Sequence, residues 1–237
     1  MTRSAMIATA CVALGLATPS LYATSTPDDT TAPADASVLE RFAHPTTPRL
    51  VTYRALRRMK ATAMGGRFTA ELEAWTTLDA QGHFTYEVVR EAGSELIRAR
   101  VLREALDTER DNYEPDNIGR MELVPANYEF RSRGLSGPDQ ADIALLPRRT
   151  TPLLLRGIAT IHTRTGDVLR VEGSPAEMPS WWTRQVDIVQ RYDRVLGVQV
   201  PVEISSTANV RIAGPSTFQM LYQYASVNGH RVEDGSY

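Results

Sequence analysis

RFTAELEAWTTLDAQGHFTYEVVR, residues 67–90, decides the fold class, because two alternating segments flank one tight turn in it. Apolar side chains of the first segment, residues 67–78, share one face of an extended chain, at Phe68, Ala70, Leu72 and Ala74. Glu71, Glu73 and Trp75 fall on the other face. A period of two predicts a strand with one buried face. The Gly-bearing turn at 79–82 predicts antiparallel pairing with a second strand at 84–90.

The same period continues on both sides of this stretch. Residues 50–64 predict a strand that the Gly65-Gly66 turn joins to residues 67–78, so the first three strands form a meander. Further strands are predicted near 126–134, 143–146, 151–163, 168–173, 182–193, 200–212 and 217–227. Because strands do not alternate with helices, we predict a mainly β (α+β) domain, a single curved antiparallel sheet or half-barrel of about ten strands covered by one amphipathic helix.

Residues 94–112 interrupt the alternation with a helical pattern. The apolar positions recur at the spacing of one helix face, at Ile97, Val101, Leu102, Ala105 and Leu106. Ser94 is the predicted N-cap, and Pro115 lies beyond the predicted end. One such helix covers only part of a sheet of about ten strands, so we expect uncovered apolar surface that meets a ligand, the leader or a partner.

The N-terminal residues have the layout of a secretory signal peptide. Arg3 precedes an uncharged apolar run at 5–17, and Ala23 is the small residue at the predicted cleavage site. The run is shorter than the ~20 residues of a membrane-spanning helix, which favours a cleaved signal (1–23) over an uncleaved anchor. Cleavage after Ala17 is the alternative. Residues 24–48 predict a flexible Thr/Pro/Asp-rich leader with a helical turn at 36–43, and residues 49–237 the folded domain.

Composition argues against several classes of function. Cys11 is the only cysteine and lies inside the apolar run, so the exported chain has no disulfide, thiolate metal site or Cys nucleophile. The net charge is −2 without a basic run, which argues against nucleic acid as a partner. The histidines are isolated, and no GxSxG elbow or phosphate loop occurs. We therefore predict no catalytic residue, no metal and no cofactor, and a periplasmic or secreted location.

The order of the elements, with three stretches of sequence, resembles the periplasmic lipoprotein-carrier superfamily, which includes the outer-membrane lipoprotein-sorting proteins. The stretches are TYRALRRMKA (52–61), GRFTAELEAWTTLDAQGHFTYEVVRE (66–91) and GVQVPVEISSTANVRIAGPSTFQMLYQY (197–224). The segment EGSPAEMPSWWTRQVDIVQRYDR (172–194) resembles a narrower family of exported bacterial proteins. The resemblance implies a half-barrel with a hydrophobic cavity for acyl chains. An inward-facing Arg is implicated in closing that cavity in the lipoprotein carriers, and no Arg of this sequence aligns with it.

These observations predict an exported, non-enzymatic protein that holds an acyl chain or a lipidated partner in an apolar cleft between helix and sheet. The predicted lining residues are Val101, Leu102, Leu106, Trp182, Met220 and Tyr222. The alternatives are an envelope protein–protein docking module with a dry core and, third, a hydrolase on an unfamiliar scaffold. Trp181 and Trp182 are interpreted either as a lip of the cleft, in peripheral contact with a membrane or partner, or as a plug at one end of the sheet.

Overall fold

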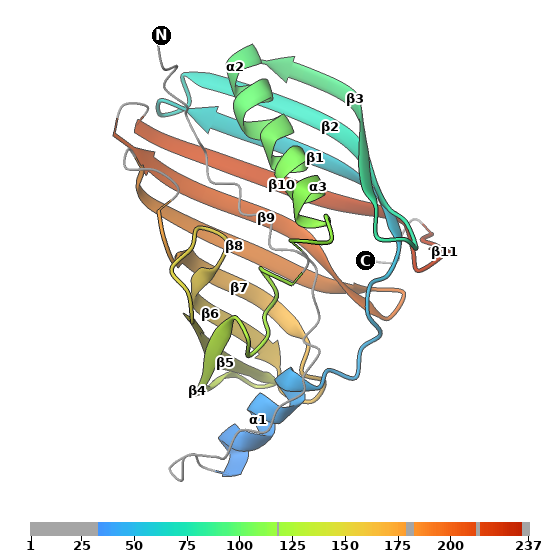
Figure 1. Cartoon of the computed structure of the whole chain (residues 1–237), viewed down its shortest axis with the longest axis vertical. Helices are drawn as coiled ribbons and strands as arrows, with labels where there is room; N and C mark the ends of the chain where they lie inside the picture. Colours follow the sequence, from blue (N-terminus) through green and yellow to red (C-terminus); the bar gives the residue numbers. More distant parts are fainter. Residues whose placement is uncertain (1–32, 118, 179–182, 212–213, 234–237) are drawn as a thin grey trace.

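One antiparallel sheet organises the chain in the computed structural model, which describes residues 33–117, 119–178, 183–211 and 214–233 (Figure 1). The sheet has 11 strands. They are β1 (Tyr53–Ala63), β2 (Phe68–Leu78), β3 (Phe84–Gly93), β4 (Tyr128–Gly137), β5 (Gln140–Pro147), β6 (Leu155–His162), β7 (Val168–Pro175), β8 (Thr183–Val195), β9 (Val198–Val210), β10 (Gly214–Val227) and β11 (His230–Arg231).

Strands that are neighbours in the sequence are mostly neighbours in the sheet. The order is β3-β2-β1-β10-β9-β8-β7-β6-β5-β4, and β11 pairs with the end of β10. β1 and β10 pair although they are far apart in the sequence, with Met59 opposite Met220. The path ends at β3 and β4, so the sheet stays open, and the connection between these edge strands carries the helix. This arrangement confirms the predicted antiparallel sheet covered by one helix.

The helix between β3 and β4 spans residues 95–112, and its geometry changes along its length. It begins as α2 (Glu95–Ile97), continues as the π-helical η1 (Arg98–Arg103) and ends as α3 (Glu104–Asn112). All five positions of the predicted apolar row are buried, and the helix packs against β1, β2 and β3. Ser94 is at the N-cap as predicted, but its side chain makes no capping hydrogen bond. No helix in the described part of the chain is long and apolar enough to cross a membrane.

β2 follows the predicted faces with one exception. Ala70, Leu72 and Ala74 are buried, as the alternation predicts. Phe68 was expected on the same buried face, but 44% of its surface is exposed. Phe68 is the first residue of β2 and pairs with Ala63, the last residue of β1, so it lies beside the turn rather than beneath the helix.

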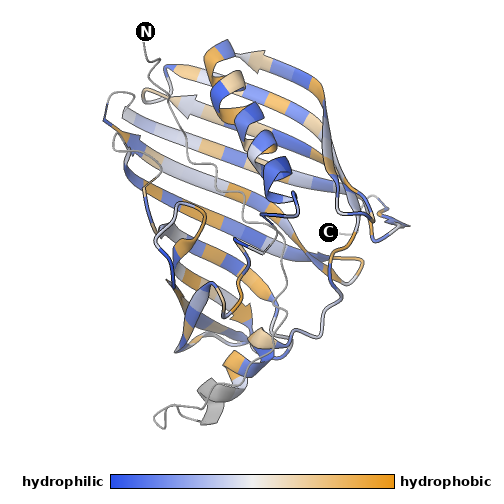
Figure 2. Ribbon diagram, viewed as in Figure 1, coloured by the Kyte–Doolittle hydropathy of each residue, from blue (hydrophilic) through white to orange (hydrophobic). Residues whose placement is uncertain are grey.

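Apolar side chains on the helix-covered face, called the inner face below, form two clusters. The first lies beneath the helix and includes Leu72, Leu102 and Met220. The second is built mainly from β4 to β8 and includes Ile143 and Leu155. Figure 2 shows hydrophobic and hydrophilic residues alternating along the strands, so one face of each strand faces water. The clusters adjoin at β8 and β9. Ile188 of the second cluster lies close to Ile204 of the first cluster there, although the two are not direct partners in the sheet.

Part of the predicted leader belongs to the folded domain. Helix α1 (Pro33–Ala43) lies at the β4 end of the sheet (Figure 1) and is longer than the predicted turn. Val38 and Phe42 are buried in the second cluster. The Phe42 ring meets the Phe130 ring edge-on, with 5.0 Å between the ring centres. Asp167 holds the chain after α1 in place. Its carboxylate accepts hydrogen bonds from Thr47 and Arg194. A few apolar residues at helical spacing therefore order a segment whose average composition predicts flexibility.

Gly157 of β6 and Gly173 of β7 lie opposite each other where these two strands approach unusually closely. A Cβ atom at Gly157 would overlap the carbonyl oxygen of Glu172, and one at Gly173 would overlap that of Arg156. Neither glycine has a left-handed φ angle. Close approach of the backbone, rather than backbone conformation, therefore requires glycine at both positions.

We expect Gly157→Ala to lower the free energy of unfolding by about 1–3 kcal/mol, because β6 and β7 must separate to admit the methyl group. The matched control is Gly137→Ala at the end of β4, where the nearest atom to the new Cβ is the Gln140 side chain at 3.5 Å. Urea unfolding followed by circular dichroism measures both variants. Equal losses in the two would contradict a steric requirement at Gly157.

Candidate functional site

The structure brings five of the six predicted lining residues together beneath the helix. Val101 and Leu102 lie on η1, Leu106 lies on α3, and Met220 and Tyr222 lie on the inner face of β10. All five belong to the first cluster and none is more than 8% exposed. All five side chains are therefore buried within one apolar cluster. Trp182 lies outside the described residues.

Arg57 is the residue that sequence reasoning missed, and it lies at the centre of this interior. It stands in the middle of β1, faces inward and is 0% exposed. Its guanidinium donates to both carboxylate oxygens of Glu109 on α3, with Nη2 2.7 Å from Oε1. Nη2 also donates to the Tyr53 hydroxyl at 2.7 Å, and Nε donates to the Thr76 hydroxyl at 3.1 Å. A bidentate ion pair therefore connects the helix to the sheet inside an apolar cluster.

The surroundings of Arg57 keep it charged. The guanidinium carbon lies 4.6 Å from the ring centre of Tyr222 and 5.2 Å from that of Phe84. Burial lowers the pKa of Arg57, but the Glu109 carboxylate raises it, and the resulting pKa is well above its ordinary value. Burial also raises the pKa of the Tyr53 hydroxyl, which therefore stays protonated and can donate to Glu109 or accept from Arg57. Arg57 therefore stays charged between aromatic walls, next to Glu109.

Two weaker connections hold the outer side of the helix to the edge strand β3. Glu91 accepts from Arg98 and from Arg103, each at 2.6 Å. The Tyr86 hydroxyl donates to Asp107 at 2.8 Å. These groups are partly exposed, so water competes for them and each pair contributes little to the stability of the contact. The buried Arg57–Glu109 pair is therefore the main polar connection between helix and sheet among the described residues.

The chain bends sharply where β3 leads into the helix. Gly93 has a φ of +84°, and a Cβ atom there would overlap the backbone carbonyl of Thr69. The next amide, that of Ser94, donates to the same carbonyl at 2.8 Å. Only glycine adopts this conformation easily, so Gly93 fixes the direction in which the helix leaves the sheet.

The sequence did contain a signal for the ion pair. Arg57 falls in the row of alternate residues Tyr53, Ala55 and Met59, all of which are buried. Glu109 falls three positions after Leu106, in phase with the apolar row of the helix. A charged residue in phase with each of two apolar faces that must meet predicts a buried pair between them.

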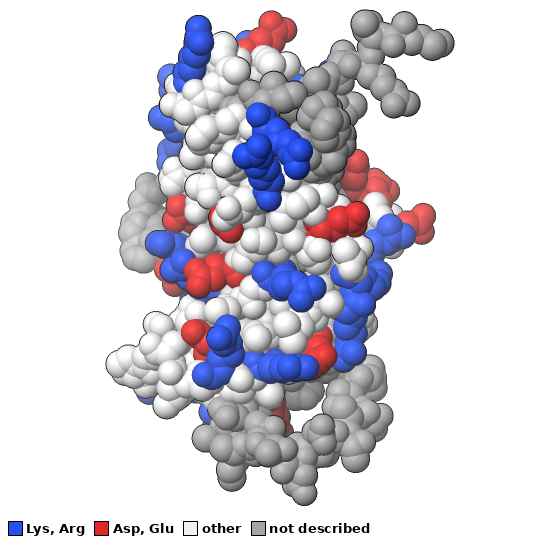
Figure 3. All heavy atoms as spheres, turned by 90° about the vertical axis from the view of Figure 1, so that its left-hand side faces the viewer, with Lys and Arg blue, Asp and Glu red and all other residues white. Residues whose placement is uncertain are grey.

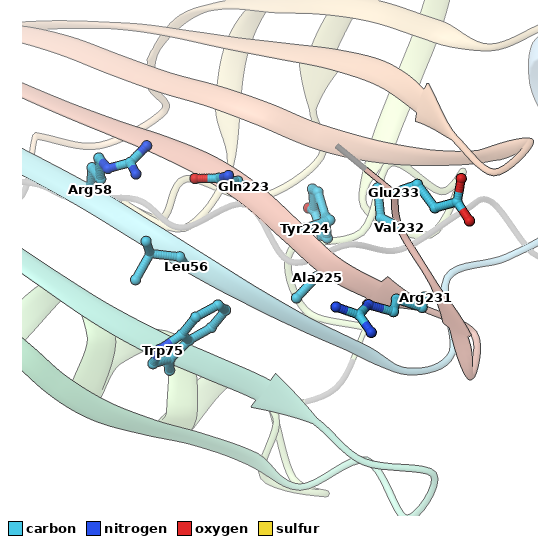
Figure 4. A pocket seen from close by; sticks show the side chains of 9 residues that line it. All are labelled: Leu56, Arg58, Trp75, Gln223, Tyr224, Ala225, Arg231, Val232 and Glu233. Atoms are coloured by element: carbon cyan, nitrogen blue, oxygen red, sulfur yellow. The ribbon is translucent and has the colours of Figure 1, made fainter. Parts of the chain in front are cut away.

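The outer face of the sheet carries a separate hollow (Figure 4). Its volume is about 580 Å³, and it is lined by Leu56, Trp75, Arg58 and Arg231 among others. The guanidinium of Arg54 lies 4.2 Å from the centre of the Trp75 ring. A second hollow of about 400 Å³ lies beside Asp167 and Arg194. Exposed charged side chains border both hollows.

The charges on one side of the molecule are mixed in sign. On the face shown in Figure 3, the Lys and Arg side chains are interspersed with Asp and Glu, without a broad field of one sign. In the part of the chain that the structure describes, no three His, Cys, Asp or Glu residues are grouped so that they could hold a metal ion.

The chain is similar to several solved structures. A LolA superfamily protein from Nitrosomonas europaea matches with a TM-score of 0.41 at 10% identity, over 86% of this chain and 95% of that one. A DUF1329 family protein from Desulfovibrio piger matches with a TM-score of 0.39 at 10% identity, over 85% and 92% of the chains. A domain described as an outer membrane lipoprotein-sorting protein, from Vibrio parahaemolyticus, matches with 0.38 at 10% identity, over 84% and 92%.

At 10% identity, these matches do not establish a family for this chain. No protein-family model matches the chain, and no curated protein matches it.

Proposed function

We propose that this chain is an exported, non-enzymatic protein that binds an acyl chain, free or attached to a protein, between the helix 95–112 and the inner face of the sheet. The ligand lies along Leu102, Leu106 and Met220 after the helix moves away from the sheet. Trp182 remains a predicted contact outside the described residues. The predicted signal peptide places the protein in the periplasm or outside the cell.

The observation that carries this proposal is the ion pair between Arg57 and Glu109. Both groups lose their hydration in the closed state, so their mutual attraction is largely offset by the cost of desolvation. When the helix leaves the sheet, both groups regain water. Opening at this position therefore costs less than separating two well-packed apolar side chains of the same size. An apolar interior whose cover is attached through charges is suited to open and close.

Geometry elsewhere in the helix supports movement of this cover. A π-helical segment is rare and occurs frequently at functional sites, and η1 places Val101 and Leu102 in such a segment. The bend at Gly93 marks the N-terminal end of the cover. The acyl chain replaces the helix as the apolar surface over β1 and β10, and each buried CH₂ contributes about 0.8 kcal/mol.

A titration with a fluorescent fatty acid, 11-(dansylamino)undecanoic acid, tests the proposal on delipidated mature protein. The wild type should bind the probe saturably. Arg57→Met leaves the Glu109 carboxylate buried without its partner in the closed state only, so it favours the open state and should tighten binding about ten-fold or more. The double variant Arg57→Met/Glu109→Leu makes the contact apolar, favours the closed state and should bind more weakly than the wild type.

The order of the three affinities is diagnostic. Met220→Trp, which fills the interior, should weaken binding in the wild-type background. If the wild type binds no probe, or if filling the interior changes nothing, the carrier proposal is wrong and the docking-module alternative takes its place. If Arg57→Met does not fold, the comparison of the double variant with the wild type still decides, because a double variant that binds as well as the wild type contradicts coupling between opening and binding.

A further inference from the structure

Gln190 of β8 is a buried polar side chain in an apolar part of the inner face. It is 1% exposed. Its partner on β7 is Val171, a member of the second cluster, and its partner on β9 is Ile204, a member of the first. Gln190 thus lies where the two clusters adjoin. The buried residues Ile188 and Val186 precede it on the same face of β8.

The side-chain amide of Gln190 has an unused donor. Its Nε2 atom is buried and has no hydrogen-bond partner among the described residues. A buried donor without an acceptor is costly, and most such groups in folded proteins are paired. Something other than the described side chains therefore supplies its partner when the group is satisfied.

We infer that Gln190 donates a hydrogen bond to the carbonyl oxygen of an acyl ligand bound on the inner face. This inference rests on the proposed function and adds the chemistry of the ligand's polar end. An acyl chain is apolar along its length and carries a single strong acceptor at one end. One amide in an otherwise apolar wall matches that distribution. A hydrocarbon without a carbonyl group would leave the amide unpaired.

The position of Gln190 agrees with a ligand that begins beneath the helix. Along the strand ladders, Gln190 pairs with Ile204, which pairs with Met220 of β10. Met220 lies 3.6 Å from Nη1 of Arg57 and belongs to the predicted lining. A chain lying across β10 and β9 therefore reaches Gln190 in the same transverse row of the sheet. The carbonyl group lies at the β8 end of that row and the hydrocarbon tail beneath the helix.

Competition against the dansylated probe tests the inference with three ligands delivered from cyclodextrin: hexadecanoic acid, methyl hexadecanoate and 1-bromohexadecane. The first two carry a carbonyl group and the third does not. Gln190→Leu should weaken binding of the ligands with a carbonyl about three- to ten-fold, the usual effect of one hydrogen bond. It should leave the affinity for 1-bromohexadecane unchanged. The wild type's preference between the acid and the ester tells whether the carbonyl comes from a free fatty acid or from an esterified chain.

The matched control is Gln185→Leu, on the same strand, where the side chain is exposed and donates to Asp187 instead. It should alter none of the affinities. A second readout is the carbonyl ¹³C resonance of bound methyl [1-¹³C]hexadecanoate, which should move upfield in Gln190→Leu when the hydrogen bond is lost. Equal weakening of all three ligands, or an unchanged resonance, overturns the inference and leaves an ordered water as the partner of Gln190. A wild type that binds none of the three instead overturns the proposed function itself.

Discussion

Leu102→Asp should lower the free energy of unfolding by at least about 4 kcal/mol, the largest effect that we expect from a single substitution in the helix. Leu102 is 0% exposed and lies in the first cluster between helix and sheet. The variant loses the burial of the leucine side chain and places a carboxylate among apolar atoms without a partner. Thermal and urea unfolding of the mature protein measure the loss, which should reach roughly 8–16 °C in the melting temperature.

The control for this prediction is Leu96→Asp on the same helix. Leu96 is 55% exposed, so the substitution should change the free energy of unfolding by less than about 0.5 kcal/mol. Similar losses for both variants would show that helix propensity, rather than burial, explains the effect. A negligible loss for Leu102→Asp would remove the helix from the core of the protein.

Most elements of the fold could be predicted from local periodicity in the sequence. Alternation in residues 67–90 was sufficient for two strands and their turn, because a strand with one wet face must alternate. The apolar row of residues 97–106 was sufficient for the helix for the same reason at a different period. Both patterns depend only on residues near in the sequence. The pairing of β1 with β10 joins residues more than a hundred positions apart, and no local pattern specifies that contact.

The same distinction explains what sequence reasoning missed at the site. The burial of Val101, Leu102 and Leu106 could be predicted, because apolar residues at helical spacing indicate a buried face. Arg57 and Glu109 each look like surface residues in isolation, since their burial is favourable only when the two are brought together. Val38 and Phe42 were missed in a different way. They lie in a polar segment whose average composition predicts flexibility, although both side chains are buried in the second cluster.

Gln190 illustrates a further limit of pattern reading. Its position in β8 is in phase with the buried residues Val186 and Ile188, so alternation places it on the inner face. Whether a glutamine there finds a partner depends on the strands on both sides of it. The sequence therefore predicts the direction of the side chain, and only the assembled sheet shows that its Nε2 is left without an acceptor.

The second large effect that we predict concerns the Arg57–Glu109 pair. The two single substitutions should differ from their combination in the free energy of unfolding. Arg57→Met should lower the free energy of unfolding by about 3–5 kcal/mol, because it leaves the Glu109 carboxylate buried without its partner. Glu109→Leu should cost a similar amount, since the guanidinium then lacks its counter-charge. In the double variant neither charge remains, and an apolar contact of similar volume replaces the pair.

We therefore expect the double variant to recover to within about 1 kcal/mol of the wild type, or to exceed it. Urea unfolding of the four proteins gives the coupling energy directly, because the two side chains touch and their effects are not additive. Additive losses in the double variant would mean that Arg57 and Glu109 stabilise the fold independently, through Tyr53 and Thr76 or through packing. That result would also weaken the proposed function, because the helix would then be held by contacts that hydration does not replace. Recovery in the double variant, together with its weaker binding of the fatty-acid probe, would show that the charges contribute ease of opening rather than stability.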